Sequence, residues 1–253
     1  MIQIFSRQLV SLTLANMKAR YRKTFAGFLW VILNPIILYS VQSVVFRKIL
    51  KIELPDYSLF LLGGLLPWIF ITSTLEMSIP YLYNSHNLLR GFRINPFLLI
   101  LCQVLDNFLN FLIAFVIILI PMMILTENQQ SAFYYLPLPI LVLLISIASI
   151  SSLASLMNVF YRDTKFVLTF ILNIMYFITP IFYSVEFVPT EYRWIIDMNP
   201  LFYLVEAFRS AVYNFEPSYF WMSLLKAFLI SLFFALISFL YWKKRKNDLY
   251  YYI

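Results

Sequence analysis

The sequence is poor in the residues that build most enzyme sites. It has one histidine, one cysteine and 12 acidic residues among 253. A membrane phosphatase, glycosyltransferase or metalloprotease needs clustered acids or histidines to hold a metal or to move protons. The single histidine, His86, stands in a loop, and only Glu76 and Asp106 fall within apolar segments. This scarcity weighs against an enzyme, and the single cysteine, Cys102, excludes an intrachain disulfide.

Glycine is also scarce, and this bears on ATP. A phosphate-binding loop needs the pattern G-x-x-x-x-G-K-[ST], because backbone amides must wrap closely around the phosphates. The four glycines, Gly27, Gly63, Gly64 and Gly91, include no pair with that spacing. We therefore expect that the chain hydrolyses no ATP and that it binds no cofactor and no metal of its own.

Charged residues are also scarce, and hydrophobic residues make up most of the chain. Charged residues make up 12% of the chain, against 62% hydrophobic and 19% aromatic residues. A helix needs about 20 apolar residues to cross a membrane, and six segments meet this need. The sequence thus predicts an all-α, polytopic membrane protein with six transmembrane helices. They are expected near residues 26–47, 57–78, 96–125, 136–159, 166–184 and 219–242.

The positions of Lys and Arg predict the orientation. With both termini inside, the cytoplasmic segments hold 13 of the 19 cations, and most of the acids fall outside. This bias predicts cytoplasmic termini. The loop "FRKILKIE" dissents, because it puts three cations outside. Since the cations flank apolar spans, the net charge of +7 indicates a membrane surface with its lipids rather than nucleic acid.

Three segments outside the spans are expected to be short helices. Residues 2–23 are amphipathic and predict a helix at the cytosolic interface, with Phe5, Leu9 and Leu12 on its apolar face. Residues 84–96 are short and basic, which is typical of a small cytoplasmic docking helix. The external loop 185–218 repeats apolar residues at helical spacing and predicts re-entrant helices. We interpret residues 1–253 as one transmembrane domain, with divisions at residues 1–25, 26–184, 185–218 and 219–253.

One face of the third span is polar. Residues three and four apart lie on one helical face, and Asp106 lies about 15 Å into the segment, counted from Pro96. Two interpretations stay open. The polar seam either bonds to another helix inside the bundle or lines a hydrated path. Its members are Gln103, Asp106, Asn107 and Asn110.

A set of residues occurs in a particular order and spacing along the chain: Arg20, Tyr21, Arg22, Gly27, Trp30, Asn34 and Pro35, then Tyr161, Arg162 and Asp163, and finally Pro180, Ile181, Asn199 and Pro200. In this order they resemble the membrane subunit of type-2 ABC exporters that secrete lipid-linked polysaccharides such as O antigen, capsule and teichoic acid. The resemblance covers nearly the whole chain.

The resemblance implies a function and a set of partners. The chain would be the permease subunit of an ATP-driven exporter in the bacterial inner membrane. It would form a homodimer and bind two copies of an ABC ATPase, which hold the ATP and Mg²⁺. The substrate would be a lipid-linked polysaccharide. The residues expected to dock the ATPase are Arg20, Arg22, Leu88, Arg90 and Arg93.

Spans one and five are expected to carry the sugar polymer. Aromatic faces with occasional amides offer many weak contacts to a moving glycan, and the resemblance places the path between these two spans. The alternative for each aromatic residue is packing against lipid or core. The expected path residues are Trp30, Asn34, Tyr39, Asn173, Tyr176 and Phe177.

Two rival functions remain open from the sequence. A type-2 ABC permease for drugs or small lipids would share the architecture, and a six-span membrane enzyme or scaffold would share the composition. The aromatic content and the long external loop favour the polysaccharide exporter. The lack of acid or histidine clusters weighs against the enzyme.

Overall fold

The computed structural model describes residues 2–22, 27–91, 94–126 and 134–252, and all regular structure within these ranges is helical. The elements are, in order, α1 (Ile2–Tyr21), η1 (Gly27–Leu29), α2 (Trp30–Ser43), η2 (Val44–Ile49), α3 (Tyr57–Ser78), α4 (Tyr81–Asn84), α5 (His86–Gly91), α6 (Pro96–Ala114), η3 (Phe115–Leu119), α7 (Ile120–Leu125), α8 (Pro137–Phe160), α9 (Thr164–Ile178), η5 (Val185–Phe187), η6 (Thr190–Tyr192), α10 (Arg193–Asp197), α11 (Pro200–Val212), α12 (Pro217–Arg245) and α13 (Leu249–Tyr252).

Five helical segments are long and apolar enough to cross a membrane, and they confirm the expected all-α, polytopic class. They are Gly27–Ile49, Tyr57–Asn84, Pro96–Leu125, Pro137–Phe160 and Pro217–Arg245. The remaining expected span, 166–184, is the 15-residue helix α9. It ends at Ile178 because Thr179 precedes Pro180 and takes an extended conformation, with ψ at 124°. The count of six transmembrane helices stays a prediction.

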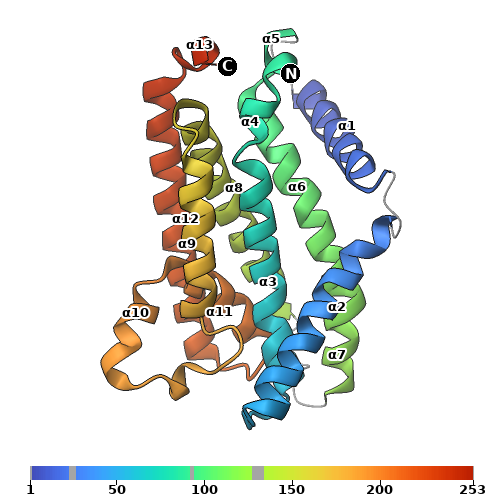
Figure 1. Ribbon diagram of the computed structural model, residues 1–253, viewed down its shortest axis with the longest axis vertical. Helices are drawn as coiled ribbons and strands as arrows, with labels where there is room; N and C mark the ends of the chain where they lie inside the picture. Colours follow the sequence, from blue (N-terminus) through green and yellow to red (C-terminus); the bar gives the residue numbers. More distant parts are fainter. Residues whose placement is uncertain (1, 23–26, 92–93, 127–133, 253) are drawn as a thin grey trace.

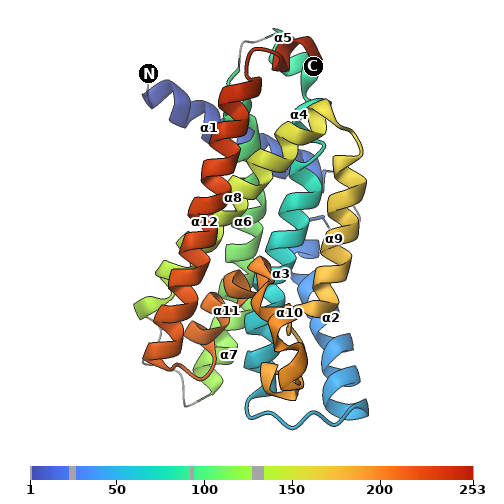
Figure 2. The same ribbon diagram turned by 90° about the vertical axis from the view of Figure 1, so that its left-hand side faces the viewer.

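Both ends of the described chain lie at the same end of the helical bundle, and α4 and α5 lie there too (Figure 1). α10 lies toward the opposite end, and α9 runs between the two ends in both views (Figures 1 and 2). The two termini and residues 84–91 therefore share one side, as the sequence predicted. That this side is cytoplasmic stays a prediction.

Proline and asparagine decide where several helices begin. A proline at the start of a helix loses no intrahelical hydrogen bond, and an asparagine before it can cap the first turn. The side chain of Asn95 accepts from the Phe97 amide at 3.0 Å, and that of Asn199 accepts from the Leu201 amide at 2.9 Å. Prolines open α6, α8, α11 and α12.

α3 lies at the centre of the bundle and packs against α2, α6, α8 and α11. Two glycines let neighbouring chain segments approach it closely. A Cβ atom at Gly63 would lie 3.2 Å from Cγ of Arg209 on α11, and one at Gly64 would lie 3.2 Å from the Ile181 carbonyl oxygen. α11 and the turn after α9 therefore rest almost directly on the α3 backbone.

α11 confirms the expected helix in the external loop. It packs against α12, α3 and α8, and Figure 2 shows it beside these long helices. Every residue from Leu201 to Val212 except Tyr203 is buried. The apolar residues that recur at helical spacing in this segment are all among them: Leu201, Leu204, Val205, Phe208 and Val212.

α1 confirms the expected N-terminal helix and lies against α6 (Figure 1). Leu9 and Leu12 of its predicted apolar face are half-buried, whereas Phe5 is exposed. Two polar contacts hold α1 in place, because Tyr81 donates to Asn16 at 3.1 Å and Cys102 lies 3.6 Å from the Leu9 carbonyl oxygen. α1 therefore belongs to the folded bundle.

Candidate functional site: a polar cavity beside a buried ion pair

A buried ion pair joins α1 to α6. The guanidinium of Arg20 donates to the Asp106 carboxylate, and its second terminal nitrogen donates to Asn107 Oδ1 at 2.8 Å. The Asp106 side chain is 1% exposed and that of Arg20 is 19% exposed. A carboxylate at this depth needs a partner, because removal from water is costly for an unpaired charge. Arg20 supplies that partner.

The polar seam divides between two kinds of contact. Asp106 and Asn107 bond to α1, and Asn107 also donates to the Gln103 carbonyl oxygen at 3.1 Å. Gln103 lies buried beside Met77 of α3, with Nε2 at 3.9 Å from the sulfur. Asn110, one turn further along α6, lies beside Tyr21 and lines a cavity. The bonding interpretation therefore describes one end of the seam, and a cavity begins at the other.

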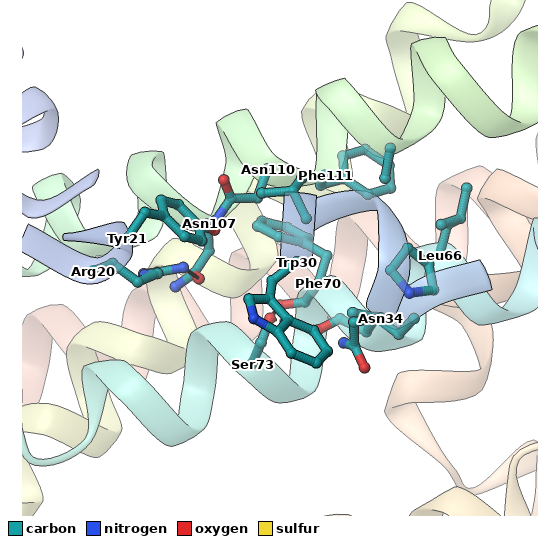
Figure 3. Close-up of a pocket in the computed structure, with 14 residues that line it drawn as sticks. Arg20, Tyr21, Trp30, Asn34, Leu66, Phe70, Ser73, Asn107, Asn110 and Phe111 are labelled. Carbon is teal, nitrogen blue, oxygen red and sulfur yellow. Dashed lines mark hydrogen bonds between the residues drawn. The ribbon is translucent and has the colours of Figure 1, made fainter. Parts of the chain in front are cut away.

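This polar cavity, of about 130 Å³, lies where α1, α2, α3 and α6 meet. Figure 3 shows Arg20, Tyr21 and Asn107 grouped on one side, Asn34 on the other and Trp30 between them. The lining residues are Arg20, Tyr21, Trp30, Val31, Asn34, Pro35, Leu66, Ile69, Phe70, Ser73, Asn107, Asn110, Phe111 and Ala114.

The lining combines amide, hydroxyl and aromatic groups with little net charge. Arg20 is the one charged lining residue in the part of the chain that the structure describes, and Asp106 behind it neutralises the guanidinium. Burial raises the pKa of the Tyr21 phenol, so this group stays protonated and neutral. Within the described ranges, no group of three or more His, Cys, Asp and Glu side chains is placed to hold a metal ion.

The predicted path residues occupy three different places. Trp30 and Asn34 line the polar cavity. Asn173 and Phe177 lie on the exposed face of α9, where Phe177 is 72% exposed. Tyr39 and Tyr176 make contacts inside the bundle, as described next. The structure of this single chain therefore does not bring the six residues together.

Tyr39 and Tyr176 connect α2 to its neighbours. Tyr39 donates to Ser58 Oγ on α3 at 2.7 Å, and the Gln42 amide on α2 donates to the Tyr176 hydroxyl on α9. The Tyr176 ring lies 5.8 Å from the ring of Trp68, measured between centroids. These contacts match the packing alternative.

We expect Tyr176→Phe to lower the free energy of unfolding by about 1 kcal/mol, because it removes one hydrogen bond and keeps the ring. Tyr176→Ala should cost about 3–5 kcal/mol, because it also empties the ring's space. Thermal unfolding in detergent measures both, with Tyr134→Ala, at an 88% exposed residue, as the control. Wild-type stability of Tyr176→Ala together with lost transport would contradict the packing role.

The predicted docking residues also differ in placement. Arg22, Leu88 and Arg90 are exposed, whereas Arg20 points into the bundle toward Asp106. Arg93 lies outside the described residues. The role of these residues in docking stays a prediction. Packing of its buried residue Leu89 holds α5 against the bundle. Leu89 belongs to an apolar cluster that contains Leu82, Leu99 and Leu249.

A second buried ion pair was missed by the sequence reasoning. Glu206 and Arg209, both on α11, form an ion pair in which both side chains are at most 9% exposed. Arg209 also donates to the Pro180 carbonyl oxygen at 2.6 Å, and its guanidinium lies 4.3 Å from the centroid of the Phe60 ring. The available signal was an acid and a base three residues apart among the buried positions of an apolar helix.

Comparisons with known proteins extend over most of the chain. The profile of a family described as "ABC-2 type transporter" matches residues 7–213. An O-antigen export system permease protein RfbA of Klebsiella pneumoniae is 25% identical over 218 residues, which cover 86% of this chain and 84% of that protein. RfbA of Myxococcus xanthus is 26% identical and covers 81% of this chain, with 80% of its own length matched. The polysialic acid transport protein KpsM of Escherichia coli is 26% identical, with 80% of each chain matched.

Proposed function

The chain belongs to the ABC-2 type transporter family, and from this membership we propose that it is the permease subunit of an ATP-driven exporter of lipid-linked polysaccharide. One observation carries the proposal. The relatives that match along at least four fifths of both chains are named for the export of O antigen and for the transport of polysialic acid. The shared property of these relatives is the movement of a long glycan.

The remaining parts of the proposal follow from the family and from the sequence. A separate ABC ATPase binds ATP and Mg²⁺, because this chain has no glycine pair with phosphate-loop spacing. Two permease chains and two ATPase chains form the exporter in the inner membrane, with both permease termini cytoplasmic. A permease for drugs or small lipids is the second candidate, and the names of the relatives do not favour it.

Deletion of the gene in its source organism tests the function. Surface polysaccharide should disappear while polymer accumulates inside the cell, and a plasmid copy should restore export. Gel analysis of polysaccharide from intact cells and from lysates measures both pools. Unchanged surface polymer with altered drug sensitivity or altered lipid distribution would instead support the second candidate.

Docking of the ATPase gives a further prediction. Arg90→Glu combined with Arg93→Glu should weaken co-purification of the ATPase, more strongly at low than at high salt, because exposed charges orient a partner through screened interactions. Arg7→Glu, at another exposed cation, is the control for a general change of charge. If the double reversal leaves both co-purification and transport-coupled ATP hydrolysis unchanged, residues 84–96 do not dock the ATPase.

A further inference from the structure

The polar cavity contains hydrogen-bonding atoms that the chain itself does not pair. Among the described residues, Arg20 Nε and Asn110 Oδ1 are buried without a hydrogen-bond partner. One is a donor and the other an acceptor, and both belong to residues that line the polar cavity. Buried polar groups almost always have a partner, because leaving one unpaired costs free energy. A ligand with both donors and acceptors, or water, therefore completes this wall.

The charge around the polar cavity narrows the class of ligand. The guanidinium of Arg20 is bonded to Asp106, and among the described residues no other lining residue carries a charge. A phosphate would meet one cation that is already neutralised, and a metal ion or an amine would meet no free carboxylate. An uncharged ligand fits the electrostatics of the site.

Shape and aromatic content narrow the class further. The polar cavity, of about 130 Å³, is too small for an oligosaccharide, so at most one ring of a glycan could enter it. Trp30, Phe70 and Phe111 offer aromatic surface, and Trp30 is 48% exposed. Aromatic faces beside amides and hydroxyls suit a ring that carries C–H groups and hydroxyls.

We propose that the polar cavity is a subsite for a single uncharged sugar ring of the exported glycan, which rests on the proposed function. Asn110 and Ser73 bond to sugar hydroxyls, and Trp30 covers one face of the ring. Arg20 is a positioning residue as well as a wall of the site, because its bonds to Asp106 and Asn107 fix α1 against α6. This subsite lies between helices of one chain, apart from the exposed face of α9.

Protection of an introduced cysteine measures binding directly. Asn34→Cys, at an exposed residue that lines the polar cavity, is made in a Cys102→Ala background, purified in lipid nanodiscs with its ATPase, and labelled with a small cationic methanethiosulfonate. Neutral methyl glycosides with the gluco, manno, galacto and N-acetylglucosamine configurations are the probes, and inorganic diphosphate is the charged comparison. At saturation, at least one glycoside should slow labelling about fivefold or more, because the bound sugar blocks the reagent until it leaves. Asn84→Cys, an exposed residue outside the polar cavity, should label at an unchanged rate.

Three outcomes of this labelling overturn the subsite. Protection by none of the glycosides means that water alone fills the polar cavity. Stronger protection by diphosphate than by any glycoside means that the site takes a phosphate. Equal slowing at Asn84→Cys means that the sugar acts on the reagent or the nanodisc and not on the site.

Export in cells provides an independent measurement with a matched pair of variants on one turn of α3. Both hydroxyls donate to their own helix, Ser73 to the Ile69 carbonyl oxygen at 2.6 Å and Thr72 to the Trp68 carbonyl oxygen at 3.0 Å. Ser73 lines the polar cavity and can still accept a hydrogen bond there, whereas Thr72 does not line it. Ser73→Ala should reduce the export rate several-fold at wild-type protein level, and Thr72→Val should not. If wild-type protein exports polymer and Ser73→Ala exports it equally well, the subsite is wrong and the proposed function stands. If the wild-type chain restores no export to the deletion strain, the proposed function itself is wrong.

Discussion

Arg209→Leu is expected to lower the free energy of unfolding by about 3–5 kcal/mol, which is what breaking a buried ion pair from one side costs. Leucine leaves the Glu206 carboxylate buried without its cation, and it also removes the bond to the Pro180 carbonyl oxygen. Since that bond holds the turn after α9 to α11, α9 should detach from the bundle along with the pair. Thermal unfolding and the yield of folded protein in detergent measure the loss.

The chain offers a control with the same spacing on its surface. Arg245 and Asp248 are also three residues apart and are 3.3 Å apart between Nη1 and Oδ2, but their side chains are 35% and 49% exposed. Arg245→Leu should therefore cost at most about 1 kcal/mol. Glu206→Leu combined with Arg209→Leu should recover much of the stability, because a buried pair can be replaced by apolar groups at little cost. Equal losses for Arg209→Leu and Arg245→Leu would mean that α11 is not packed as the structure has it.

The second large effect concerns Arg20 and Asp106, and it should be asymmetric. Arg20→Leu leaves Asp106 unpaired at 1% exposure and should cost about 3–5 kcal/mol. Asp106→Leu should cost less, because the long Arg20 side chain is already 19% exposed and can turn toward water. Arg20→Lys should not rescue fully, since one ammonium cannot reproduce the fork that bonds Asp106 and Asn107 together.

A double-mutant cycle separates this pair from general packing. Arg20→Leu/Asp106→Leu should be more stable than Arg20→Leu alone, and the coupling energy should have the sign of an attraction. Protease cleavage within α1 reports whether the helix has left α6, and Arg7→Leu, at an exposed residue of the same helix, should change neither quantity. Strict additivity of the two single losses would show that the side chains do not interact.

The depth of Asp106 could be predicted from its place in an apolar segment, but its partner could not. Arg20 is one of four cations within six residues, and membrane orientation explains all four equally well. Which of them turns inward depends on the register in which α1 packs on α6. A single sequence does not contain that register, so Arg20 was assigned to docking along with Arg22.

The sequence also could not show which side of each span faces a cavity and which packs against another helix. The positions of five spans followed from apolar length alone, and the apolar face of α11 followed from helical spacing. Trp30 and Tyr39 are the two aromatic residues of α2, and their spacing alone could not show that Trp30 lines the polar cavity whereas Tyr39 bonds to α3. Glu206 and Arg209 were counted only as charges of a loop, because their burial is decided by tertiary packing and cannot be read from the sequence.

The early end of α9 has a consequence for the lipid around it. Its 15 residues give an apolar height of about 22 Å, whereas the hydrocarbon core is about 30 Å thick. The outer face carries Phe166, Phe170 and Phe177, each at least 66% exposed, so acyl chains that contact this face meet a column too short for them. Hydrophobic mismatch of this size is relieved by local thinning of the bilayer, at a fraction of a kcal/mol per Å. Where α9 crosses the membrane, we therefore expect the bilayer beside this face to be locally thinned.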